Sequence, residues 1–183
     1  AAYQKMGETW SVPAVVYVAT AMPEPGVVQH FGRGDLVIGT LDAAAALDAG
    51  QRQRLQDVVD LFATAQVPVR VSPDVMGELW SKLMGNCADN AIAGLAQLPY
   101  GRVAALPAIR ELQRALVREV VAVAQADGQH LPLAEALEAM ERIAIAMPAQ
   151  LSSTAQDMAR GKPSEIDHLN GYVARRGAEL GVD

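Results

Sequence analysis

The feature that most constrains the fold is a change in hydrophobic period close to Ser72. Between Val12 and Val71 the apolar segments are rich in β-branched residues and bounded by Pro, Gly or Asp, as short strands are; they are VPAVVYVAT, GVVQHF, DLVIG and VPVRV. After Val71 no segment convincingly predicts a strand, and apolar residues recur at helical spacing. The sequence therefore predicts a sheet-bearing part, residues 1–71, followed by an all-helical part, residues 72–183.

Capping residues, glycines and prolines mark the expected helix ends. One helix interrupts the strands, from about Asp48 to Gln66, with Asp48 as its cap. Beyond it the expected helices are one that begins at Ser72 and Pro73, one over about Pro107–Asp127 that stops at Gly128, and one over about Leu133–Ala146 that ends before Pro148. Two more helix starts, Ser153 with Gln156 and Ser164 with Asp167, are separated by Gly161 and Pro163.

Composition argues against several kinds of partner. The 183 residues are half apolar, and a net charge of −6 with no basic cluster argues against nucleic acid. The single cysteine, Cys87, allows no intrachain disulfide, which is typical of a reducing compartment and predicts a cytoplasmic protein. The longest nearly unbroken apolar run, from Val12 to Met22, is too short to span a bilayer as a helix, and no signal peptide is recognisable. We therefore expect no membrane partner.

Three features could carry chemistry, but each has a simpler explanation. The glycines of GRGDLVIG, residues 32–39, do not open a helix as a dinucleotide-binding loop must, and a hairpin turn explains them. No ligand spacing relates the three histidines, His30, His130 and His168, to one another or to a cysteine, so no metal site is predicted. Ser152 and Ser153 lack the Gly-x-Ser-x-Gly turn that exposes a nucleophile, and a helix cap is the alternative.

The stretch WSKLMGNCADN, residues 80–90, puts a cation and two amides on an otherwise apolar helix. Lys82, Asn86 and Asn90 recur at every fourth position, so their side chains share one stripe of the helix. Asparagine is a poor residue inside a helix because its amide competes for backbone hydrogen bonds. The stripe is either a solvated face or the lining of a binding site, and this segment alone favours the solvated face.

Two helical segments together resemble a known family. ELWSKLMGNCADNAIAGL and SSTAQDMARGKPSEIDHLNG are similar to the two signature segments of the ketopantoate reductases (2-dehydropantoate 2-reductases), and GVVQHFGRGDLVIG resembles that family's paired strands. The resemblance implies an α/β remnant of a Rossmann-type dinucleotide-binding domain, followed by an all-α helical domain of the 6-phosphogluconate dehydrogenase C-terminal type. It also implies that the cofactor-binding N-terminal half precedes this chain, which would be a fragment.

The activity implied by the resemblance is the NADPH-dependent reduction of 2-dehydropantoate to pantoate, in pantothenate and coenzyme A biosynthesis, with the substrate in a cleft between the two domains. Lys82 corresponds to the family's proton donor, and Lys82, Asn86, Asn90 and Ser153 to its substrate-binding residues. Glu165 and the backbone of Ala21 correspond to its cofactor contacts. A lysine suits the reaction, because its ammonium stabilises the alkoxide that forms at C2 and then supplies a proton.

Other functions stay open from the sequence alone. One is a related 2-keto acid reductase, because Pro99-Tyr100-Gly101 and Gln150 depart from residues that some relatives have around the substrate. Another is a non-catalytic helical module for dimerisation or ligand binding. Apolar positions on the helix over 107–127, such as Leu112, Leu116 and Val120, leave room for a homodimer.

Overall fold

The structure is a computed structural model that describes residues 11–41 and 47–182. The chain divides into two compact units, residues 1–79 and 80–183. Among the described residues, the first unit holds a small sheet and the helix over 49–64, and the second is helical, as the change of period predicted. The division falls after the first turn of a long helix instead of before it, and the assignment of residues 1–71 and 72–183 to two domains stays a prediction.

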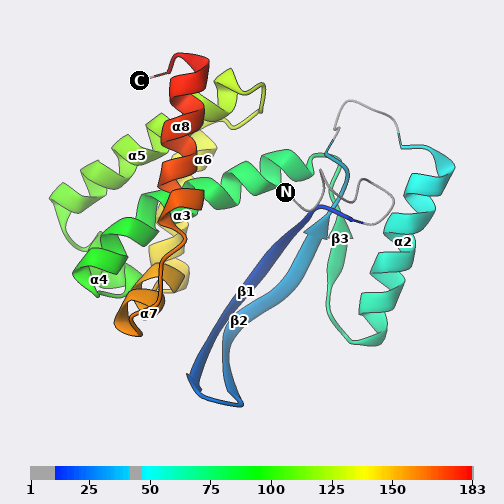
Figure 1. The fold of residues 1–183 in the computed structure, drawn as a ribbon, viewed down its shortest axis with the longest axis horizontal. Helices are drawn as coiled ribbons and strands as arrows, with labels where there is room; N and C mark the ends of the chain where they lie inside the picture. Colours follow the sequence, from blue (N-terminus) through cyan, green and yellow to red (C-terminus); the bar gives the residue numbers. More distant parts are fainter. Residues whose placement is uncertain (1–10, 42–46, 183) are drawn as a thin grey trace. The chain divides into compact units, whose positions relative to one another are not determined.

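The sheet has three strands in the order β1-β2-β3. Strand β1 (Ala14–Glu24) pairs antiparallel with β2 (Val27–Ile38), and β2 pairs parallel with β3 (Val69–Val71). Figure 1 shows β1 and β2 as a long hairpin. Its turn contains Gly26, whose φ of 84° lies in the left-handed region that glycine tolerates best.

The segment around Gly32 corrects one prediction. Gly32 and Gly34 of GRGDLVIG do not form a hairpin turn; they lie inside β2, which joins most of the two expected strands GVVQHF and DLVIG into one. Gly32, Arg33 and Gly34 all have positive φ, and the pairing with β1 shifts twice here, so β2 bulges. The bulge places the Arg33 guanidinium 4.0 Å from the centre of the Tyr17 ring.

The sheet packs against helical residues within the first unit. Val15 and Val37 pack with Val75 from the first turn of α3 (Val75–Ala96), and Leu79 packs against this cluster. Elsewhere in the unit, α2 (Ala49–Thr64) contacts β3 and buries Leu55. These contacts explain why the first turn of α3 belongs to the sheet-bearing unit.

The helix predictions are largely confirmed. Besides α2 and α3, the structure describes α4 (Tyr100–Ala104), α5 (Pro107–Ala126), α6 (Leu133–Ala146), α7 (Ser153–Ala159), the short 3-10 helix η1 (Ile166–His168) and α8 (Asn170–Leu180). The sequence did not predict α4. Asp48 forms the expected capping box with Gln51 at the start of α2. At the start of α3 the Asp74 carboxylate accepts the Gly77 N–H at 2.8 Å.

The helical unit buries one face of α5 at its centre. Val117, Val120 and Val123 of α5 are buried, as are Ala136 and Met140 of α6. Figure 1 shows α5, α6 and α8 gathered along α3. Because Val120 belongs to this core, it is not available for a dimer contact, whereas Leu112 remains 47% exposed.

Candidate active site

The polar stripe of α3 is not a uniformly solvated face. Lys82 and Asn86 are half-buried, and Asn90 is 1% exposed. On the neighbouring apolar stripe, Met84 and Cys87 are fully buried. Burial raises the pKa of the Cys87 thiol to about 12, so this thiol stays protonated at neutral pH.

Asn90 meets a residue from α4. The Tyr100 hydroxyl donates to Asn90 Oδ1 over 3.5 Å, a long hydrogen bond. Burial raises the pKa of Tyr100 well above its usual range, so the hydroxyl stays a donor at any ordinary pH. The sequence placed Tyr100 in a loop, where no pattern marked it as a partner of the stripe.

The first residues of α4 hold the chain that leads into α7. The Tyr100 N–H donates to the Gln150 carbonyl at 3.0 Å, and the Gly101 N–H donates to the Pro148 carbonyl at 2.9 Å. A Cβ at position 101 would lie 2.9 Å from that carbonyl oxygen, so only glycine fits without displacement. Tyr100 thus connects Asn90 to the chain just before the serine pair.

The two serines have different positions. Ser152 is 0% exposed, and its hydroxyl accepts the Ala155 N–H at 3.1 Å, so it caps α7. Ser153, the first helical residue, is exposed. The predicted helix start is confirmed, but the cap is Ser152 rather than Ser153.

Helix α7 docks on the C-terminal half of α3. A Cβ at Gly94 would lie 2.8 Å from Thr154 Cγ2 and 3.2 Å from Met158 Sδ, so the two helices meet closely at this glycine. The Gln97 side chain donates to the Ala155 carbonyl at 3.3 Å. Because Gly94 is one turn beyond Asn90, α7 brings Ser153 to the end of α3 that carries Asn90.

The segment after α7 returns to the middle of α3. The Asn170 amide, at the start of α8, donates to the Cys87 carbonyl at 3.1 Å, and the Tyr172 ring lies 6.0 Å from that of Trp80. Just before η1, Glu165 is exposed. The sequence missed Asn170 as a contact, although its segment, DHLNG, lies inside the resemblance.

Ala21, the remaining predicted contact, belongs to the first unit. It lies half-buried on β1, opposite Gln29 of β2. Because a backbone contact needs no particular side chain, the residue type carried no signal of its own. The role of Ala21 stays a prediction.

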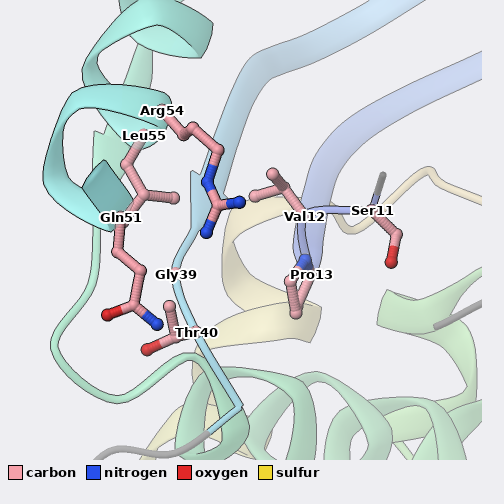
Figure 2. Close-up of a pocket in the computed structure, with 8 residues that line it drawn as sticks. All are labelled: Ser11, Val12, Pro13, Gly39, Thr40, Gln51, Arg54 and Leu55. Atoms are coloured by element: carbon pink, nitrogen blue, oxygen red, sulfur yellow. The ribbon is translucent and has the colours of Figure 1, made fainter. Parts of the chain in front are cut away.

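The described residues show little other ligand chemistry. No group of three or more His, Cys, Asp and Glu side chains among them is placed to hold a metal ion. A small pocket in the first unit, with room for about one water molecule, is lined by residues of α2 and the segments that flank β1 and β2 (Figure 2). Figure 2 shows Arg54 reaching from α2 toward Val12 there. None of the predicted site residues lines this pocket.

The apolar run near the N-terminus is accounted for by the sheet. Most of the stretch from Val12 to Met22 lies in strand β1, where successive side chains point to opposite faces. Within residues 11–41 and 47–182 no helix is both long and apolar enough to cross a bilayer.

Comparisons with known proteins identify the family. Residues 74–183 match the family model described as ketopantoate reductase PanE/ApbA C terminal. The 2-dehydropantoate 2-reductase of Pyrobaculum aerophilum is 40% identical over 98% of this chain and 60% of its own length. The Vibrio cholerae enzyme of that name is 32% identical over 85% of this chain and 50% of its own. The chain therefore spans about half the length of the curated relatives it matches.

Solved structures share the fold. A PanE/ApbA family ketopantoate reductase from Ralstonia eutropha superimposes with a TM-score of 0.80 at 48% identity, over 93% of this chain and 53% of that one. A 2-dehydropantoate 2-reductase from Geobacter metallireducens gives 0.84 at 25% identity, over 100% of this chain and 60% of that one. Fold and sequence define the class as the helical C-terminal domain of such reductases with part of an α/β region before it. The chain belongs to the ketopantoate reductase family.

The contact at Gly101 predicts a stability effect. Gly101→Ala would place a methyl group against the Pro148 backbone and should lower the free energy of unfolding by about 1–3 kcal/mol. Gly85→Ala is the control, because its Cβ would meet only the flexible end of Ile143, and its effect should stay below about 1 kcal/mol. Urea unfolding followed by circular dichroism measures both, and equal losses would argue against the contact.

Proposed function

We propose that the intact protein reduces 2-dehydropantoate to pantoate with NADPH, in the route to pantothenate and coenzyme A. The observation that carries the proposal is the stripe of Lys82, Asn86 and Asn90 on α3 of a ketopantoate reductase family member, with Asn90 buried against Tyr100. An ammonium and two neutral amides suit an anionic keto acid, because they add no negative charge beside it. We keep the cytoplasmic location as part of this proposal.

Lys82 is the proposed catalytic residue. The Lys82 ammonium donates a hydrogen bond to the C2 carbonyl oxygen and stabilises the negative charge that develops there. It then gives a proton to that oxygen, which completes the alcohol, and takes a proton back from solvent. NADPH, when bound, supplies the hydride that C2 accepts.

Substrate binding is assigned to Asn86, Asn90 and Ser153. The two amides offer donors one and two turns beyond Lys82, which holds the keto acid along the helix. Ser153 lies at the start of α7, where its exposed hydroxyl and the first backbone N–H groups suit a carboxylate. The Ser152 cap supports this position because it fixes the first turn of α7.

Glu165 and the backbone of Ala21 are the proposed cofactor contacts. The exposed Glu165 carboxylate is available as an acceptor for cofactor N–H or O–H groups, and Ala21 offers backbone groups on β1. Among the described residues no glycine-rich turn opens a helix, because Gly32 and Gly34 lie within β2. Glu165 and Ala21 are therefore each proposed as a separate cofactor contact, and the described residues supply no pyrophosphate cradle.

A second candidate is the reduction of a related 2-keto acid. The fold is shared with D-mandelate dehydrogenase, which superimposes with a TM-score of 0.79 at 18% identity and whose structure contains NADH and anilino(oxo)acetate.

A ketopantoate reductase from Staphylococcus aureus is described as dimeric, which supports a homodimer as part of our proposal. The third candidate function is that of a non-catalytic helical module for dimerisation or ligand binding.

The first test removes the proposed proton donor. In the full-length protein, Lys82→Ala should lower kcat by about 10²- to 10⁴-fold, the usual contribution of a general acid, while the circular dichroism spectrum stays unchanged. Lys162→Ala changes an exposed lysine after α7 and is the matched control. Steady-state assays of NADPH oxidation measure both, and full activity of the Lys82 variant would remove that residue from the mechanism.

Alanine variants of the two serines test substrate binding and fold stability separately. Ser153→Ala should raise the KM for the keto acid by about 10- to 100-fold, because a hydrogen bond to a charged group is lost. Ser152→Ala should instead lower the free energy of unfolding by about 1 kcal/mol, because a helix cap is lost. Assays and urea unfolding of both variants distinguish the roles, and a higher KM from Ser152→Ala alone would reverse the assignment.

A substrate panel tests the choice of keto acid. Full-length protein assayed with 2-dehydropantoate and with smaller or aromatic 2-keto acids, using NADPH and NADH in turn, should give its highest kcat/KM with 2-dehydropantoate and NADPH. Higher kcat/KM on another keto acid would favour the second candidate. No turnover with any of them would favour the non-catalytic module.

A further inference from the structure

A buried carboxyl group lies next to the stripe and has no role in the proposed chemistry. Asp89 precedes Asn90 on α3 and is 3% exposed. Its Oδ1 accepts a hydrogen bond of 2.6 Å from Nε2 of Gln113, which lies on α5 and is 1% exposed. The pair therefore links α3 to α5 inside the helical unit.

While the Asp89 carboxyl is ionised, the remaining oxygens of Asp89 and Gln113 cannot form a hydrogen bond with each other. Asp89 Oδ2 and Gln113 Oε1 are both buried and, among the residues that the structure describes, neither has a hydrogen-bond partner. An ionised carboxylate and an amide carbonyl are both acceptors only. A proton on Oδ2 turns that atom into a donor, and an acid and an amide can then pair through two hydrogen bonds. Ionisation would leave two buried acceptors unpaired, which is costly.

The charges around Asp89 do not supply a direct counterion bond. Arg110 of α5 favours the ionised form of Asp89, but its guanidinium forms an ion pair with Glu141 of α6 at 3.3 Å. Tyr100 of α4 is neutral at ordinary pH. Desolvation dominates and raises the pKa of Asp89 to about 6. A second hydrogen bond that exists only in the acid would raise this pKa further.

We propose that Asp89 is a positioning residue, held as a neutral carboxylic acid that bonds through both oxygens to Gln113 and so supports Asn90 without placing a negative charge beside the keto acid. The role in the site rests on the proposed function, since it assumes that Asn90 binds an anionic substrate. The protonation state of Asp89 does not rest on the proposed function, because it follows from the burial of the pair and from the number of its acceptor atoms.

The neutral acid has a consequence for stability. A carboxyl whose pKa is higher in the folded than in the unfolded chain stabilises the fold fully below the unfolded value of about 4, and this contribution is lost as pH rises to the folded pKa. Asp89→Asn keeps both hydrogen bonds to Gln113 but does not titrate. The ratio of the wild-type unfolding constant to that of Asp89→Asn should therefore rise about 50-fold between pH 4 and pH 7, for a folded pKa of about 6.

Urea unfolding of the full-length protein at several pH values measures this ratio. Asp57→Asn is the matched control, because Asp57 accepts a similar bond of 2.8 Å from Gln53 at an exposed site on α2, where solvent screens a charge. The ratio of the wild-type unfolding constant to that of Asp57→Asn should change much less over the same pH range. A flat ratio for Asp89→Asn, like that of the control, would overturn the neutral acid. An infrared band of a protonated carboxyl that disappears in Asp89→Asn would support it.

The KM for the keto acid tests the proposed role of Asp89 in the site. In the wild type the KM for the keto acid should rise about tenfold relative to Asp89→Asn as Asp89 ionises, because a negative charge then repels the bound anion. An identical pH profile in both proteins would overturn the positioning role while leaving the neutral acid standing. If the wild type reduces no 2-keto acid, the proposed function fails and the site role fails with it, whereas the unfolding data still decide the protonation state.

Discussion

Helix α3 buries polar side chains in the interior of the helical unit, and each of them needs a partner from another element. Asn90 has the Tyr100 hydroxyl from α4, and Asp89 has the Gln113 amide from α5. The backbone carbonyl of Cys87 receives the Asn170 amide from the start of α8. An unpaired polar group costs more free energy when it is buried than when it is exposed to water. These pairs therefore restrict where α4, α5 and α8 can lie.

Close backbone approach is the second requirement around α3. Gly94 lets α7 pack against α3, and Gly101 lets the chain before α7 hydrogen-bond to the start of α4. A side chain at either position would separate the elements that bring Ser153 to the end of α3 carrying Asn90. The geometry of the candidate site thus depends on two glycines that are not among the predicted site residues.

Local patterns predicted the helices well and the strand irregularities poorly. The helix over Leu133–Ala146 was predicted with its observed bounds, because apolar spacing and a following proline are local signals. Glycine-rich sequences suit a turn as well as a bulge, and only the pairing with β1 identifies the bulge at Gly32–Gly34. The α7 cap was placed one residue late because both neighbours are serines and only the hydrogen bond to Ala155 identifies Ser152.

The amino-acid sequence by itself determined the two-part organisation, most helices, the single stripe of Lys82, Asn86 and Asn90, and the family resemblance, because all of these are encoded in local spacing and composition. Only the tertiary structure decided that Asn90 is buried, that Tyr100 faces it, and that Asp89 pairs with Gln113. These contacts join residues that are 10 and 24 positions apart on different helices. No periodicity within one helix specifies such a pairing, since it depends on how the helices pack.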